Sequence, residues 1–235
     1  MLPLEGKRDN WVASALLAAL VIIPLTKWLA PGLIPFSYFG VWDSHGTGFA
    51  DWMRAGWPLL AYGLVLSSFL SIYKKIAGHK LQEVGTKRDM FFSGLLVSLW
   101  AGVAEEIAFR WFLFYGSFAF LAIGNFLFFG WLGFGLPQWL NMHLLAPVAN
   151  WTTFGYLQGW IYYPGTWIVG ASLLSANSFF RDGHKYLGIV GFINSWFVGM
   201  FLFYMMFNFG LMSAIILHFS YDVIIFTMAA IVWGD

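Results

Sequence analysis

Three short clusters of acidic, basic and histidine residues interrupt otherwise hydrophobic stretches of the sequence. They are Glu105-Glu106-Ile107-Ala108-Phe109-Arg110, Phe180-Arg181-Asp182-Gly183-His184 and His218-Phe219-Ser220-Tyr221-Asp222. Carboxylates and imidazoles can accept and donate protons, and an imidazole N–H can stabilise an oxyanion. The chemistry that these residue types suit best is the activation of a water molecule for hydrolysis.

The spacing within the first cluster divides its two glutamates. Glu106 and Arg110 are four residues apart, so a helix places them on one face, within reach of an ion pair. Glu105 is rotated by ~100° from Glu106 and cannot fully share that face. The spacing predicts a structural Glu106–Arg110 pair and leaves Glu105 as the candidate acid or base. A purely structural ion-pair cluster is the open alternative.

The two histidine clusters have the same four-residue spacing. His218 and Asp222 fall on one helix face, where a carboxylate can orient an imidazole and fix its tautomer. His184 follows Phe180 by four residues, next to the charged pair at the end of a hydrophobic stretch. A hydrogen-bonded packing pair and an ordinary interfacial histidine are the alternatives for these clusters taken singly.

The composition predicts that these clusters lie in a membrane. The 235-residue chain is 60% hydrophobic, 21% aromatic and only 10% charged, whereas soluble domains are roughly 25% charged. No Asp, Glu, Lys or Arg occurs from Trp111 to Phe180, although one helical crossing needs only about 20 residues. We therefore expect an all-α, multi-pass bundle of about seven transmembrane helices.

Hydropathy places the expected spans in order along the chain, at residues 11–30, 55–73, 90 to beyond 110, 116–136, 161–180, 187–209 and 211–233. The Pro/Gly-broken segment 137–160 between two of them is expected to be interfacial or re-entrant. The basic segment 74–89 is expected to be cytoplasmic by the positive-inside rule, and Lys7 and Arg8 place the N-terminus on the same side.

Several functional classes are excluded or disfavoured by the sequence. A net charge of +1 gives no reason to expect a nucleic-acid partner. The absence of cysteine removes thiolate nucleophiles and cysteine-ligated zinc. The H-E-x-x-H, G-x-S-x-G and G-x-G-D signatures of other intramembrane hydrolases are missing, as is a phosphate-binding G-x-x-x-x-G-K.

The three clusters in order, each on or beside a hydrophobic helix, resemble the motifs of the CAAX prenyl protease and bacteriocin-processing (CPBP, or Abi) family. The matching patterns are E-E-x-x-x-R at Glu105–Arg110, F-x-x-x-H at Phe180–His184 and H-x-x-x-D at His218–Asp222. The resemblance divides the chain into residues 1–89, with two spans and the basic loop, and a CPBP-like core at 90–235. It implies a helical membrane fold with an intramembrane cavity.

The resemblance also implies the activity of an intramembrane glutamate-type peptidase acting on a membrane-delivered, in some members prenylated, protein or peptide. Glu105 and His184 would then activate water, and His218 with Asp222 would form the oxyanion site. Glu106 and Arg110, with Phe180, would support the architecture. The prenyl-protein proteases carry Asn where Asp222 stands, and an ionised Asp would repel an oxyanion. Orientation of His218 is therefore the role expected for Asp222.

The region 116–167 is longer and more aromatic than this family pattern predicts, and we expect it to be an insertion. It could dock a membrane protein complex, so a non-catalytic assembly factor or scaffold on the same fold is the alternative function. A proton-coupled transporter is a further alternative, because buried acids and histidines also form proton relays. The sequence has no internal repeat of the kind that many transporters show. No cofactor is expected. Zinc is not excluded, because two histidines and a glutamate are a ligand set found in catalytic zinc sites.

Overall fold

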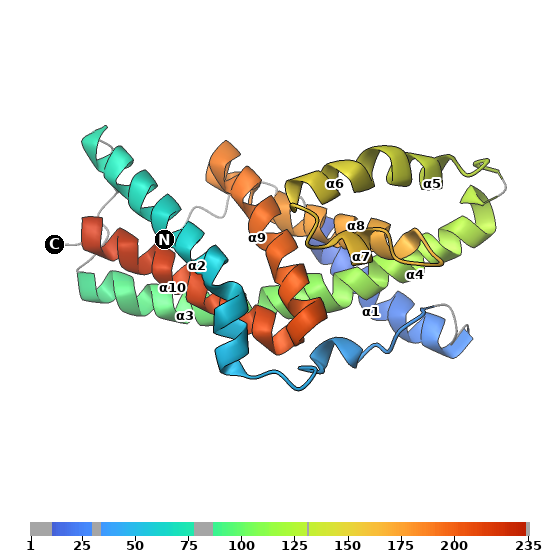
Figure 1. Cartoon of the computed structure of the whole chain (residues 1–235), viewed down its shortest axis with the longest axis horizontal. Helices are drawn as coiled ribbons and strands as arrows, with labels where there is room; N and C mark the ends of the chain where they lie inside the picture. Colours follow the sequence, from blue (N-terminus) through green and yellow to red (C-terminus); the bar gives the residue numbers. More distant parts are fainter. Residues whose placement is uncertain (1–10, 30–33, 78–86, 131, 234–235) are drawn as a thin grey trace. The chain divides into compact units, whose positions relative to one another are not determined.

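The computed structural model (Figure 1) describes residues 11–29, 34–77, 87–130 and 132–233. These residues form helices joined by turns and contain no strand, which confirms the all-α fold class. The helices group into two compact units. The first unit contains the chain up to Tyr38 and Ala108–Met200, and the second contains Phe39–Ile107 and the chain from Phe201 onwards.

Within the described residues, four helices are long and apolar enough to cross a membrane, namely Phe49–Ile76, Phe91–Phe128, Lys185–Phe209 and Leu211–Val232. The chain is therefore an integral membrane protein by the length and composition of its helices. Lys7, Arg8 and most of the 74–89 loop lie outside the described residues. The cytoplasmic location of the N-terminus and of this loop thus stays a prediction.

The predicted number of about seven spans is not confirmed. The expected spans at 90–110 and 116–136 form one uninterrupted helical run, Phe91–Phe128, because the aromatic residues that join them include no turn former. The expected span at 161–180 is broken near Pro164 and Gly165, which has a φ of +87°. The helix that follows has only 16 residues. The described apolar stretch Leu16–Trp28, part of the 19-residue N-terminal helix Trp11–Leu29, is also not among these four helices.

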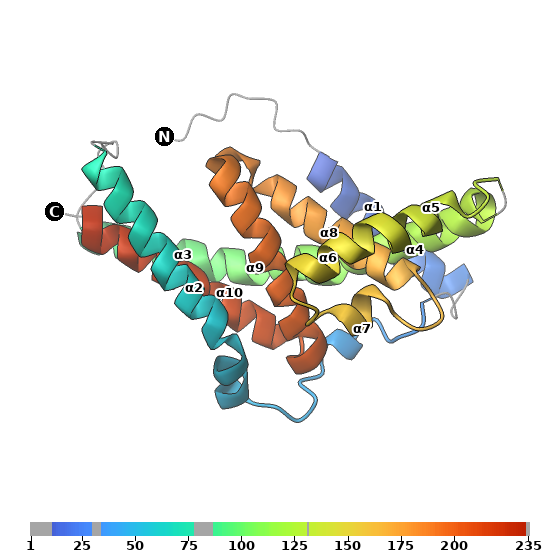
Figure 2. The same cartoon turned by 45° about the horizontal axis from the view of Figure 1, so that its top comes forward.

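The second unit is built around three helices that lie side by side (Figures 1 and 2), which are α2 (Phe49–Ile76), α3 (Lys87–Glu105) and α10 (Leu211–Trp233). On α2, a Cβ atom at Gly56 would lie 2.5 Å from Leu217 of α10. Near the other end, Lys75 Nζ donates a hydrogen bond of 2.5 Å to the Val232 carbonyl. The two helices therefore run parallel and in close contact.

Helix α3 runs antiparallel to α10. Its early residue Gly94 faces Phe226, and its later residue Gly102 faces the Ile215 carbonyl, 3.1 Å from the position that a Cβ would take. A side chain larger than hydrogen at position 102 would push the two backbones apart. This close approach brings the end of α3 at Glu105, and Glu106 directly after it, near His218 of α10.

The first unit packs a further set of helices, which are α1 (Trp11–Leu29), α4 (Phe114–Gly124), α7 (Gln158–Ile161), α8 (Ile168–Gly183), the 3-10 turn η5 (Lys185–Leu187) and the beginning of α9 (Gly188–Phe209). Helix α1 packs on α4 where Gly116 meets Ala19. Helix α4 also packs on α8, and α7 folds back onto α8 at Gly170, whose missing side chain admits the Ile161 carbonyl. Helix α8 is thus held from two sides.

The long aromatic region predicted at 116–167 forms α4, a turn, and a helical run composed of α5 (Leu136–Leu140), η4 (Asn141–Leu145) and α6 (Ala146–Thr152). The run is about 25 Å long at 1.5 Å per residue, less than the ~30 Å of a hydrocarbon core. Phe134 and Phe154 flank it, 95% and 90% exposed, and both have left-handed backbones with φ of 48° and 50°. Its interfacial or re-entrant location stays a prediction.

Candidate functional site

The first predicted cluster lies where the helix changes its geometry. Glu105 is the last residue of α3, and Glu106 begins η2 (Glu106–Leu113), a π-helical segment. Such segments are rare and are frequent at functional sites, because the extra residue in each turn redirects side chains. The Glu106 side chain is completely buried, and so is Arg110. The predicted ion pair between them stays a prediction.

The second unit contains a short contact between two predicted site residues. Nδ1 of His218 and Oε1 of Glu106 are 2.8 Å apart, and the two side chains are 4% and 0% exposed. A carboxylate can only accept, so Nδ1–H of the imidazole donates this bond. Glu106 therefore fixes the orientation of His218, in addition to any architectural role.

Asp222 approaches the other nitrogen of the same imidazole. Its Oδ2 lies 3.7 Å from His218 Nε2, which is an ion-pair distance but too long for a hydrogen bond. Glu105 ends α3, the helix that packs on α10, and directly precedes Glu106. The structure thus brings together three of the predicted residues, the His218 imidazole and the carboxyl groups of Glu106 and Asp222, with Glu106 at the shorter distance.

The first unit contains the F-x-x-x-H motif. His184 follows the end of α8, and its Nδ1 lies 2.8 Å from the Phe180 carbonyl oxygen. Because a carbonyl oxygen only accepts, Nδ1 carries the proton, and in the neutral ring Nε2 carries the lone pair. This tautomer can act as a proton acceptor. Phe180 also contacts the His184 ring, with centroids 4.6 Å apart.

Phe180 organises a second polar group in the same unit. The guanidinium of Arg110 lies 4.0 Å from the centre of the Phe180 ring, a cation–π contact, and Phe109 meets the same ring edge-on. The four-residue spacing of the motif thus corresponds to direct contacts of Phe180: its carbonyl accepts the bond from His184 and its ring covers Arg110.

The seven predicted site residues are shared between the units. Glu105, Glu106, His218 and Asp222 belong to the second, and Arg110, Phe180 and His184 to the first. Sequence reasoning missed the Glu106–His218 bond, because the two residues are 112 positions apart and no spacing rule links them. Among the described residues, no group of three or more His, Cys, Asp or Glu side chains is arranged to hold a metal ion.

No family model matches the chain, and neither the curated proteins nor the solved structures include a match. The resemblance to CPBP proteins therefore rests on the three motifs alone.

Proposed function

We propose that the chain is an intramembrane peptidase that hydrolyses a peptide bond of a membrane-associated protein or peptide. The contact that carries the proposal is the 2.8 Å bond between Glu106 and His218, two side chains buried in apolar helices. Burying these groups is unfavourable by several kcal/mol unless they pair, and polar groups at such depth generally have a function. Asp222 lies 3.7 Å from the other nitrogen of the same imidazole.

In the proposed mechanism, Glu105 accepts a proton from the attacking water, as the family pattern implies, and returns it to the amide nitrogen as the C–N bond breaks and the amine leaves. His218 serves the oxyanion that forms on the scissile carbonyl. This role requires an N–H at Nε2, because Nδ1–H is already directed to Glu106. A doubly protonated imidazole meets the requirement, and the adjacent carboxylates stabilise its positive charge.

Asp222 has a supporting role in this mechanism. Its Oδ2 lies 3.7 Å from His218 Nε2, beside the N–H that would bind the oxyanion. An ionised carboxylate cannot itself bind an anion, but it can stabilise the positive charge of the imidazolium between catalytic cycles. Orientation of the ring, the role expected for Asp222 from the sequence, is assigned to Glu106 in this proposal.

His184 is the second proposed proton acceptor. The bond from its Nδ1 to the Phe180 carbonyl leaves the lone pair on Nε2, as general-base catalysis requires. The chain offers a matched control, because Nδ1 of the exposed His143 lies 3.0 Å from the Trp139 carbonyl in the same four-residue geometry. His143 belongs to none of the three motifs.

The test is cleavage of membrane-anchored reporter peptides by the full chain reconstituted in phospholipid vesicles. Glu105→Gln and His184→Ala should each lower the cleavage rate by about 10²–10⁴-fold, the usual contribution of a general acid or base. His143→Ala should cleave at the unsubstituted rate. Wild-type rates for both Glu105→Gln and His184→Ala would refute the proposed chemistry.

A second candidate, a membrane assembly factor, is favoured by the two exposed phenylalanines. Phe134 and Phe154 are 95% and 90% exposed in left-handed conformations that are unfavourable by about 1–3 kcal/mol for such residues. Backbone strain of this kind is concentrated at residues that have a function. If this function is correct, Phe134→Ala with Phe154→Ala should abolish co-purification of a membrane complex, while Glu105→Gln should retain it together with full biological activity.

A further inference from the structure

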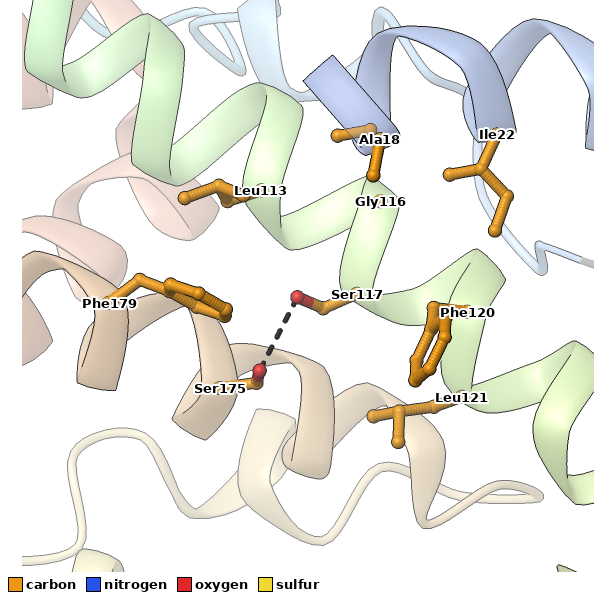
Figure 3. A pocket seen from close by; sticks show the side chains of 10 residues that line it. Ala18, Ile22, Leu113, Gly116, Ser117, Phe120, Leu121, Ser175 and Phe179 are labelled. Carbon is orange, nitrogen blue, oxygen red and sulfur yellow. Dashed lines mark hydrogen bonds between the residues drawn. The ribbon is translucent and has the colours of Figure 1, made fainter. Parts of the chain in front are cut away.

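A cavity of about 330 Å³ lies between α1, α4 and α8 in the first unit (Figure 3). Ala18 and Ile22 line it from α1, Phe120 and Leu121 from α4, and Phe179 from α8. Among the described residues, no charged side chain lines it. It contains none of the residues placed in the proposed catalytic chemistry, so it needs an explanation of its own.

Small residues create this cavity. Ala18 and Ser117 form part of its walls, and Gly116 allows α1 and α4 to approach so closely that an added Cβ would lie 2.5 Å from that of Ala19. The only polar side chains of the lining are Ser117 and Ser175, which point toward each other in Figure 3, with their oxygens 3.4 Å apart. The two hydroxyls face each other, and the other lining side chains are hydrocarbon.

The cavity opens to the outside of the first unit. Phe120 on its rim is 65% exposed, and Ala18 on the opposite rim is also exposed. The residues contributed by α4 lie within Phe91–Phe128, a helix apolar and long enough to cross a membrane, and the exposed side chains at the opening are apolar, as a contact with lipid hydrocarbon requires. Water is not stable in an apolar cavity, and an empty cavity forfeits the dispersion contacts of its lining.

We propose that one hydrocarbon chain of a bilayer phospholipid occupies this cavity. Its volume is at the lower end of the ~300–1,000 Å³ typical of small-molecule sites, which suits a single chain rather than a whole lipid. The uncharged lining provides nothing for a headgroup, which would remain at the membrane surface. This proposal does not depend on the peptidase function.

The test uses the full chain in vesicles of phosphatidylcholine that carries a photoreactive diazirine in one acyl chain. After irradiation, mass spectrometry locates the lipid adducts. Adducts are expected at Ser117, within the cavity, and at Phe126, which is 79% exposed on the same long helix and reports ordinary lipid contact. Ala18→Trp fills the cavity from α1, and the adjacent Leu17→Trp, at an exposed position outside the lining, is its matched control.

Filling the cavity should abolish the Ser117 adduct in Ala18→Trp and in a second variant from another helix, Ser175→Phe. The adduct should remain in Leu17→Trp, and the Phe126 adduct should remain in every variant. A wild-type chain labelled at Phe126 but not at Ser117 would overturn the proposal and leave the cavity to a protein side chain or a second copy. Ser117 labelling that survives in Ala18→Trp with an unchanged circular dichroism spectrum would also overturn it.

Discussion

The bond between Glu106 and His218 predicts a strong energetic coupling that can be measured without any substrate. Both side chains are buried, and their atoms are 2.8 Å apart. If Glu106 or His218 is replaced by leucine, the other side chain stays buried between apolar helices and loses this hydrogen bond. Each single replacement should therefore lower the free energy of unfolding by about 3–5 kcal/mol, the usual effect of breaking a buried pair.

The double replacement should lower the free energy of unfolding by less than the sum of the two single effects. A hydrogen bond to a charged group contributes about 1.5–3 kcal/mol. Couplings between side chains in transmembrane helices average about 0.6 and reach about 1.7 kcal/mol. Because this bond is short, buried and charged, we expect a coupling of about 1.5 kcal/mol, near the upper end of the membrane values.

Reversible unfolding in bicelles, followed by circular dichroism or steric trapping, measures the four members of the cycle. A second cycle on His218 and Asp222 is the internal comparison, because their atoms are 3.7 Å apart. Its coupling should be clearly smaller. Additivity within about 0.5 kcal/mol for Glu106 and His218, or a larger coupling for Asp222 than for Glu106, would refute the assignment of Glu106 as the main partner of the imidazole.

Three further predictions concern other parts of the chain. Gly102→Val should destabilise the second unit by about 1–3 kcal/mol through overpacking against α10, whereas Gly159→Ala, with open space around its Cβ, should be neutral or stabilising in the same unfolding assay. Burial opposes ionisation of Asp182, but hydrogen bonds and charges from its two basic neighbours outweigh it and hold the pKa of this carboxyl below its ordinary value. Its stabilising contribution is therefore present above the ordinary pKa and is lost as the pH falls through the lowered one. Asp182→Asn should remove that part of the acid-range change in melting temperature; an unchanged acid profile would contradict this. Phe154→Asn should raise the free energy of unfolding by about 1 kcal/mol, because Asn tolerates the left-handed backbone; a loss of stability would show that the phenylalanine ring packs in the membrane.

The sequence by itself determined the physical class of this protein and the chemical groups that it buries. A chain with 10% charged residues and a long stretch without any must place its helices in lipid. This follows from composition, because hydrophobic transfer depends on residue type and segment length and not on the partners of each residue. The four-residue spacing of Phe180 and His184 likewise anticipated a local contact, since one helical turn joins them.

Only the tertiary structure decided which carboxylate orients His218. The four-residue spacing predicted that Asp222, one helical turn away, orients His218. The hydrogen bond to the imidazole is made instead by Glu106 on another helix. Helices α3 and α10 meet through Gly102, and the helix turns π-helical at Glu106, which redirects that side chain. Helical periodicity describes neighbours within one helix, whereas the distance between residues 106 and 218 depends on how two helices pack. That packing is set by the many side chains along both helices and is not encoded in any short motif.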